Sequence, residues 1–148
     1  MAAKNAMEDF RRNISFHVQK GSEGDILLVA HLTDHFHDIR MEVAADFESL
    51  MIVSARFDFV RHPSQDCPAV AARMERLVGV SIGRGLNRKL QETFGGSEGC
   101  GNLRVMLLGL LPLAMNVKAA TGFTDEQAML DSISERLTGS CAGYLKRS

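Results

Sequence analysis

The sequence predicts an α+β fold, in which an antiparallel meander of three to four strands is followed by three to four helices packed on one face of the sheet. Two observations lead to this prediction. Apolar residues alternate with polar ones in the N-terminal half, and from Cys67 onward they recur with the period of an amphipathic helix. The chain has 148 residues, of which 45% are hydrophobic, enough for one core.

The N-terminal half contains four predicted strands. In the first, Ile14, Phe16 and Val18 alternate with Ser15 and His17. The other three cover residues 26–32, 39–43 and 50–59, and short polar turns at residues 21–25 and 34–38 join the first three. Sequential strands with short connections are most economically antiparallel neighbours, so we expect a meander with one face left for helices to cover.

The first predicted helix begins near Cys67, with Asp66 as its N-cap and Pro68 in its first turn. Gly79, Gly83 and Gly85 interrupt the helical pattern. These glycines lack the preceding strand and the following Lys-Ser/Thr of a phosphate-binding loop. We therefore expect them to supply positive φ angles in a helix–helix turn.

Three further helical patterns follow. One runs over residues 86–94, and a long apolar one begins near Cys100 and is predicted to kink at Pro112. The capping box at residues 124–127 opens the last helix. We find no repeat or linker, so we predict a single domain over residues 10–137, with loose termini at 1–9 and 138–148.

Composition limits the partners and the compartment. Seventeen basic and eighteen acidic residues give a formal charge of −1, so we expect neither nucleic acid nor a membrane surface as partner. The most apolar stretch, residues 103–117, contains Arg104 and is shorter than the ~20 apolar residues of a spanning helix. Three cysteines without a secretory signal predict a cytoplasmic protein with reduced thiols.

Two of the three cysteines, Cys67 and Cys100, lie where helices are predicted to begin. Free N–H groups at a helix start favour a thiolate, which is the form that binds metals and acts as a nucleophile. The alternative is that each cysteine is a small apolar filler, because free cysteine is often buried. Cys141 lies in the C-terminal tail and receives no role.

Residues 34–38 offer four potential metal ligands in five positions, among them His37 and Asp38. In an extended segment, His35 and His37 would point to the same side, a spacing that suits zinc. The alternative is a solvated turn in which Asp38 caps the next strand. A structural zinc site has four ligands, so the metal hypothesis requires these residues to lie beside both cysteines, and fewer ligands would indicate an open or labile site.

These clusters resemble a bacterial family known as domain of unknown function 2889. The likeness rests on the stretches that begin at His37-Asp38, at Asp66-Cys67-Pro68 and at Leu77, and on Phe94 to Cys100, and it covers about residues 10 to 115. Family members usually carry a histidine where this chain has Asn102. The resemblance implies a shared fold unit and a weakened or retuned site here, because a neutral amide is a poor ligand for soft metals.

The order of acidic residue, cysteine and second cysteine is also similar to iron-sulfur scaffold proteins of the NifU and IscU type. That likeness implies a zinc ion or an iron-sulfur cluster held by Asp38, Cys67 and Cys100, with His37 or His35 as a fourth ligand. The first cysteine of those scaffolds is absent here.

Two functions follow as expectations. The first is a metal-binding or thiol-carrier module, of the scaffold kind, with its site at Asp38, Cys67 and Cys100, assisted by His37. The second is an enzyme or binding protein for a small organic molecule, in which His37, Asp38 and Asn102 line a pocket over the sheet. A purely structural or interaction subunit is the third alternative, and the eight methionines favour a protein partner or a homo-oligomer only if they are exposed.

Overall fold

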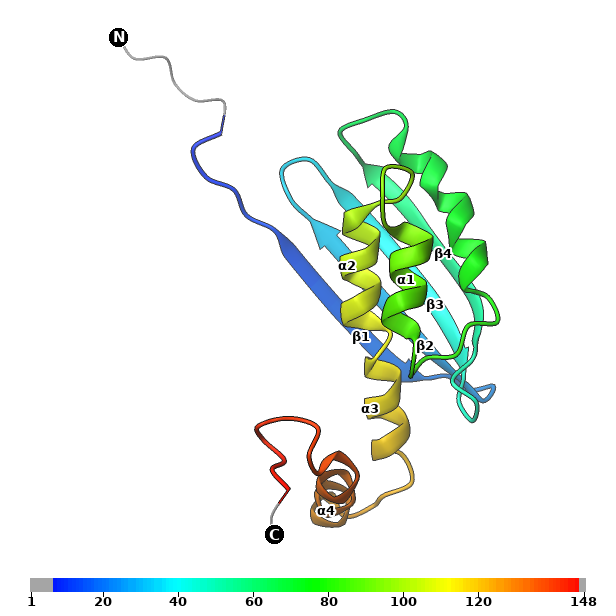
Figure 1. The fold of residues 1–148 in the computed structure, drawn as a ribbon, viewed down its shortest axis with the longest axis vertical. Helices are drawn as coiled ribbons and strands as arrows, with labels where there is room; N and C mark the ends of the chain where they lie inside the picture. The colour runs from blue at the N-terminus through cyan, green and yellow to red at the C-terminus, as the bar shows by residue number, and fades with distance from the viewer. Residues whose placement is uncertain (1–6, 147–148) are drawn as a thin grey trace.

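A computed structural model describes residues 7–146 of the chain. Strands β1 (Asn13–Lys20), β2 (Asp25–Thr33), β3 (Asp38–Asp46) and β4 (Ile52–Arg61) form one sheet in the order β1-β2-β3-β4. Each strand is antiparallel to the next, as Figure 1 shows. The predicted meander is confirmed.

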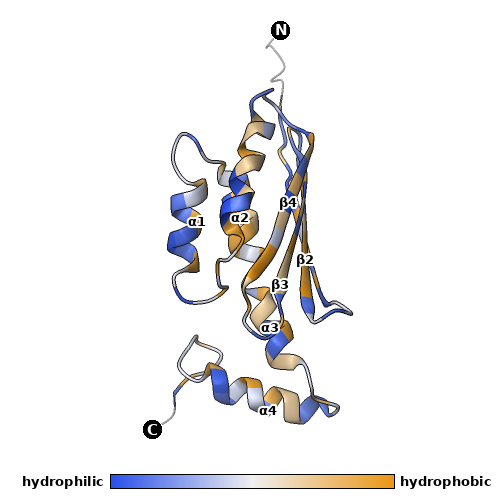
Figure 2. Ribbon diagram, turned by 90° about the vertical axis from the view of Figure 1, so that its right-hand side faces the viewer, coloured by the Kyte–Doolittle hydropathy of each residue, from blue (hydrophilic) through white to orange (hydrophobic). Residues whose placement is uncertain are grey.

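Five helical segments follow the sheet. They are the 3₁₀ helix η1 (Cys67–Leu77) and the α-helices α1 (Leu86–Phe94), α2 (Gly101–Leu110), α3 (Leu113–Ala120) and α4 (Glu126–Leu137). Figure 2 shows η1, α1 and α2 as a layer on one side of the sheet, while α4 lies past its end beside α3. The α+β class is therefore confirmed, with η1, α1 and α2 on one face of the sheet and α4 packed against α3 instead.

The core lies between the sheet and this helical layer. Ile26, Leu28, Ala30 and Leu32 alternate along β2 and are at most 1% exposed, and every second residue of β3 from Ile39 is equally buried. From the helices, the largest contribution comes from the buried face of α2: Leu103, Met106, Leu107 and Leu110. The alternation seen in the sequence thus faces one set of side chains toward the helices.

The other face of the sheet carries no helix among the described residues. Its side chains include the cross-strand pairs Arg40 with Asp58 and Glu42 with Arg56, which are mostly exposed. Glu42 accepts a hydrogen bond from the Arg56 side chain, 2.8 Å from Nε. An antiparallel sheet of this kind can keep one face in water.

The long apolar helix is divided as predicted. It bends at Pro112, between α2 and α3, because proline has no N–H to continue the helical hydrogen bonds. In the part of the chain that the structure describes, the stretch Gly101–Ala120 is the one helix long and apolar enough to cross a membrane by length and composition. A helix that packs in a core meets the same criteria, and α2 buries its apolar face against the sheet.

The turn glycines behave as predicted, whereas the two predicted helix caps differ in detail. Gly79, Gly83 and Gly85 have φ angles of 89°, 150° and 85°. Asp66 is the N-cap residue of η1, as predicted, but its side chain makes no cap hydrogen bond. The last helix is capped by Asp125, whose carboxylate accepts hydrogen bonds from two backbone N–H groups, rather than by Thr124.

The predicted loose termini fall partly outside the described residues, at 1–6 and 147–148. Residues 7–9 and 138–146 form turns and irregular backbone without helix or strand.

The packing of α2 predicts a large effect of truncation in its core-facing side. Leu107→Ala removes a side chain that is 0% exposed and should lower the free energy of unfolding by about 2 to 5 kcal/mol, because a cavity remains where the leucine packed. Urea unfolding followed by circular dichroism measures the change. The control Leu130→Ala, at a side chain 47% exposed on α4, should cost less than about 1 kcal/mol. Equal losses in both variants would contradict this account of the core.

Candidate functional site

The predicted site clusters meet at one end of the molecule. The β2–β3 connection, the start of η1 and the start of α2 lie at the same end of the sheet, at the top of Figure 1. This arrangement follows from the topology, because β2 ends and β3 begins there, and β4 returns to the same end before η1. The residues of the three clusters are therefore close enough in the fold for their contacts with one another to be described.

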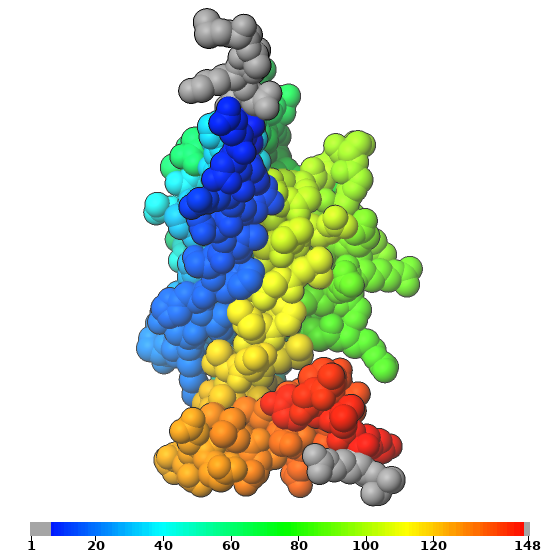
Figure 3. Space-filling model, turned by 90° about the vertical axis from the view of Figure 1, so that its left-hand side faces the viewer, coloured from blue at the N-terminus to red at the C-terminus, as the bar shows by residue number. Residues whose placement is uncertain are grey.

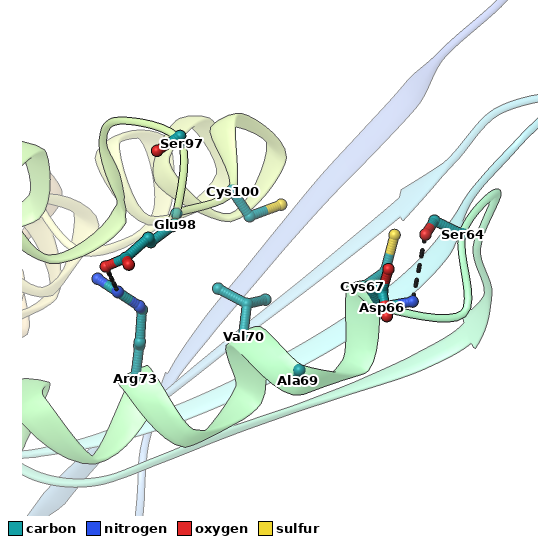
Figure 4. Close-up of a pocket in the computed structure, with 10 residues that line it drawn as sticks. Ser64, Asp66, Cys67, Ala69, Val70, Arg73, Ser97, Glu98 and Cys100 are labelled. Atoms are coloured by element: carbon teal, nitrogen blue, oxygen red, sulfur yellow. Dashed lines mark hydrogen bonds and ion pairs between the residues drawn. The ribbon is translucent and has the colours of Figure 1, made fainter.

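Cys67 and Cys100 line one pocket of about 340 Å³, which lies between the starts of η1 and α2. In Figure 4 the Cys100 side chain extends from α2 toward the start of η1, where the Cys67 sulfur projects. Both cysteines are half-buried, and neither forms a disulfide. Ser64, Asp66 and Val70 contribute further to the walls.

The position of Cys100 is fixed by a tight loop between α1 and α2. Its backbone N–H donates to the Phe94 carbonyl at 3.0 Å, and the Cys100 backbone is extended as the N-cap of α2. A side chain at Gly99 would overlap the Phe94 carbonyl, so only glycine fits at that position. The glycines of this segment therefore hold the cysteine at the helix start.

Arg73 connects η1 to the same loop. Its guanidinium donates to the Thr93 carbonyl and to Glu98 Oε2, each at 3.0 Å. The Arg73 side chain is 19% exposed, whereas Glu98 is 83% exposed. Arg73 thus forms a wall of the pocket, and its charge is already paired.

His37 joins the β2–β3 connection to α2. Its Nδ1 lies 2.9 Å from Asp34 Oδ1, and its Nε2 lies 3.2 Å from the Nδ2 of Asn102. A neutral ring that donates from Nδ1 to the carboxylate and accepts at Nε2 from the amide satisfies both contacts. Asn102, which replaces the histidine expected from the family resemblance, therefore contacts His37 directly.

Asp34 is the centre of this connection, and its side chain is fully buried. It accepts hydrogen bonds from the backbone N–H groups of Phe36 and His37 and from Arg12 Nε, each at 2.8 Å. Burial alone would raise the pKa of its carboxyl, but these hydrogen bonds and the one from His37 Nδ1 outweigh burial and lower the pKa from 3.8 to about 2. Arg61 also donates to the carbonyls of Asp34 and His37.

Asp38 lies apart from the cysteine pocket. As the first residue of β3, it has its side chain on the open face, because its neighbour Ile39 points into the core. There Asp38 Oδ1 lies 2.7 Å from Nε2 of His31. His35 is exposed and packs edge-on against the Phe36 ring.

Of the predicted metal ligands His37, Asp38, Cys67 and Cys100, the two cysteines share the pocket. His37 contacts Asn102 and Asp34, and Asp38 contacts His31. Within residues 7–146, no group of three or more His, Cys, Asp and Glu residues is placed to hold a metal ion. The structure therefore offers a pair of thiols rather than a four-ligand cage.

Sequence reasoning missed the residues that organise this end of the molecule: Arg12, Asp34, Arg61 and Arg73. The arginines contact partners that lie 20 to 27 positions away along the chain, and Asp34 combines one such distant partner, Arg12, with partners in its own turn. One signal was available for Asp34, because an aspartate that begins a short connection commonly accepts hydrogen bonds from backbone N–H groups two and three residues later.

The fold and site define a small α+β protein with a two-cysteine pocket at one end of its sheet. The family model described as "Protein of unknown function (DUF2889)" matches residues 10–116, which is more than half of the chain. The chain belongs to this family. No curated protein and no solved structure matches it, and the likeness to iron-sulfur scaffold proteins receives no support from these comparisons.

The buried carboxylate predicts a dependence of stability on pH. Asp34→Asn should lower the free energy of unfolding at pH 7 by about 2 kcal/mol, because a group whose folded pKa lies below its unfolded value stabilises the folded state above the unfolded pKa. That contribution is lost as the pH falls from about 4 through the folded pKa of about 2. The difference between the wild type and the variant should therefore narrow over this range in urea unfolding.

Asp9→Asn is the matched control, because the Asp9 carboxylate is 71% exposed and pairs with an exposed arginine. It should leave stability unchanged at both ends of the pH range. A difference between Asp34→Asn and the wild type that stays constant down to pH 2 would contradict the assignment.

Proposed function

We propose that this protein is a small binding and carrier module, in which the thiols of Cys67 and Cys100 hold a soft metal ion such as Zn²⁺. The observation that carries the proposal is that both cysteines line one pocket although they lie 33 positions apart in the sequence. Thiolates are the preferred ligands of soft metals. Reduced thiols of this kind accord with the cytoplasmic location expected from the sequence.

Two protein ligands suit transient rather than structural binding. A structural zinc site is closed by four protein ligands, whereas an open site leaves positions for water or for a group from a partner. A pair of thiolates therefore binds an ion that can be passed on. An iron-sulfur cluster would require additional ligands from a partner, because clusters are usually held by four cysteines.

The surroundings of the pocket favour a cation. Its walls carry the carboxylates of Asp66 and Glu98 and the guanidinium of Arg73. Because Arg73 and Glu98 form an ion pair, Asp66 is the carboxylate that remains to attract a cation.

The first N–H groups of α2 have no hydrogen-bond partner among the described residues, so they are free to stabilise a thiolate at Cys100. At the start of η1, in contrast, the N–H groups of Cys67 and Ala69 already donate to the carbonyls of Ser64 and Asp66. A metal-bound thiolate at Cys100 would thus meet the free N–H groups of α2, and the metal ion would meet the Asp66 carboxylate in the pocket wall.

The second candidate, a binder of a small organic molecule through His37, Asp38 and Asn102, has less support. His37 and Asn102 are hydrogen-bonded, which favours it, but their facing groups already satisfy each other. Asp38 is directed to the opposite face of the sheet. The three side chains therefore do not converge on one cavity, as such a site requires.

The proposal predicts thiol-dependent metal binding. The protein, purified without an affinity metal and stripped with a chelator, should bind Zn²⁺ in equilibrium dialysis with elemental analysis of the protein compartment. Cys67→Ser and Cys100→Ser should each weaken Zn²⁺ binding by at least about tenfold. Loss of a residue that only hydrogen-bonds to a metal ligand already lowers affinity by about this factor, and loss of the ligand itself should cost at least as much. Circular dichroism verifies that each variant is folded.

Cys141→Ser is the matched control, because Cys141 is exposed in the C-terminal segment, outside the pocket. It should retain the wild-type affinity. Wild-type protein that binds no Zn²⁺, or binding that is lost equally in all three variants, would contradict the proposal.

A further inference from the structure

One edge of the sheet is unprotected. Figure 3 shows β1 at the surface along its length, beside α2 and α3. Within residues 7–146, the backbone of β1 hydrogen-bonds to β2 alone, so its outer N–H and C=O groups have no backbone partner. A free edge of this kind is a template for pairing with another strand.

The opposite edge of the sheet, formed by β4, is protected from strand pairing in two ways that do not apply to β1. The segment after η1 bonds to the beginning of β4: Ile52 N–H donates to Val80 at 2.9 Å, and Gly79 N–H donates to Ile52 at 2.8 Å. The rest of β4 carries charged side chains that discourage edge pairing, including Arg56 and Asp58. In contrast, residues 13–19 of β1 contain no charged residue and no proline.

Partly exposed apolar side chains lie beside the free edge of β1, on the face of the sheet that the helices cover. Phe16 at the middle of β1 is 38% exposed and lies against α2, where a Cβ at Gly109 would come 2.5 Å from the ring. Val105, one turn before Gly109 on the same side of α2, is 47% exposed. The edge therefore combines unpaired backbone groups with uncovered apolar area.

We propose that β1 pairs antiparallel with β1 of a second copy of this chain, about a two-fold axis that passes between the two Phe16 residues. In this register, Ile14 of each copy lies opposite Val18 of the other on the helical side. Ser15 lies opposite His17 on the open side. Residues directly opposite each other share a face, so apolar meets apolar and polar meets polar at every position.

The self-complementary sequence of β1 is the reason to choose a second copy over an unrelated peptide. The charged residues at its ends, Arg12 and Lys20, fall opposite each other in this register. Arg12 is paired with Asp34 at 2.7 Å, and the Lys20 ammonium lies 4.6 Å from the centre of the Phe47 ring. Both cations are therefore engaged within their own copy, and the repulsion across the seam is reduced.

The axis stands perpendicular to the sheet, because paired residues keep to the same face. The helical layers of the two copies then lie on the same side of one continuous sheet. This places α2 and its Val105 next to the seam in each copy, so the exposed apolar area is covered in the same step. An isologous contact of this kind closes on itself and yields a dimer rather than a fibre.

Sedimentation equilibrium of the full chain tests the proposal and should give twice the chain mass, with a dimer that dissociates on dilution. The double variant Ser15→Lys with His17→Lys places like charges opposite each other at both symmetric positions. It should raise the dissociation constant of the dimer at least about tenfold. Both positions are exposed, so circular dichroism should remain that of the wild type.

A second double variant, Ser15→Lys with His17→Glu, tests the register. It puts opposite charges across the seam at the same positions, so the dimer should be restored. The control Ser54→Lys places a charge on an exposed position of β4 and should leave the dimer unchanged. A monomer at every concentration, or a dimer that both charge variants leave intact, would overturn the proposal.

Discussion

The burial of one face of the meander beneath α2 is the constraint on which the rest of the structure depends. The alternating apolar residues of β2 and β3 can leave water only if a helical layer covers them, and α2 supplies the most apolar part of that layer. Because α2 packs with its start at the end of the sheet where β2 meets β3, Cys100 and Asn102 are brought to that end. The site is thus a consequence of how the core is covered.

Asp34 extends this constraint from the core to the connecting segments. A buried carboxylate is tolerated only when hydrogen bonds replace its hydration, and Asp34 has partners from the segment before β1 and from its own turn. Through His37 the same group reaches Asn102 at the start of α2. One side chain therefore fixes the N-terminal segment, the β2–β3 connection and the start of α2 relative to one another, and Cys100 lies at that helix start.

The sequence was informative where local periodicity or backbone chemistry decides the outcome. The alternation from Ile26 to Leu32 and the bend at Pro112 are of this kind. It was uninformative where the partner is distant, as for Arg12 or Arg73, because nothing near these residues indicates their contacts. Asp38 is an intermediate case. Its place beside His37 suggested a shared site, yet the alternation that buries Ile39 already directs Asp38 to the other face.

The pocket and the free edge of β1 can act independently for a geometric reason. In an antiparallel pair of β1 strands, the two copies run in opposite directions, so the end of the sheet that bears Cys67 and Cys100 points away from the corresponding end of the other copy. Neither pocket faces the seam, and no residue of one copy completes the thiol pair of the other. If the pocket holds an ion as proposed, the groups that complete its coordination would therefore come from solvent or from a different partner, and the ion would be accessible in the monomer and in the proposed dimer.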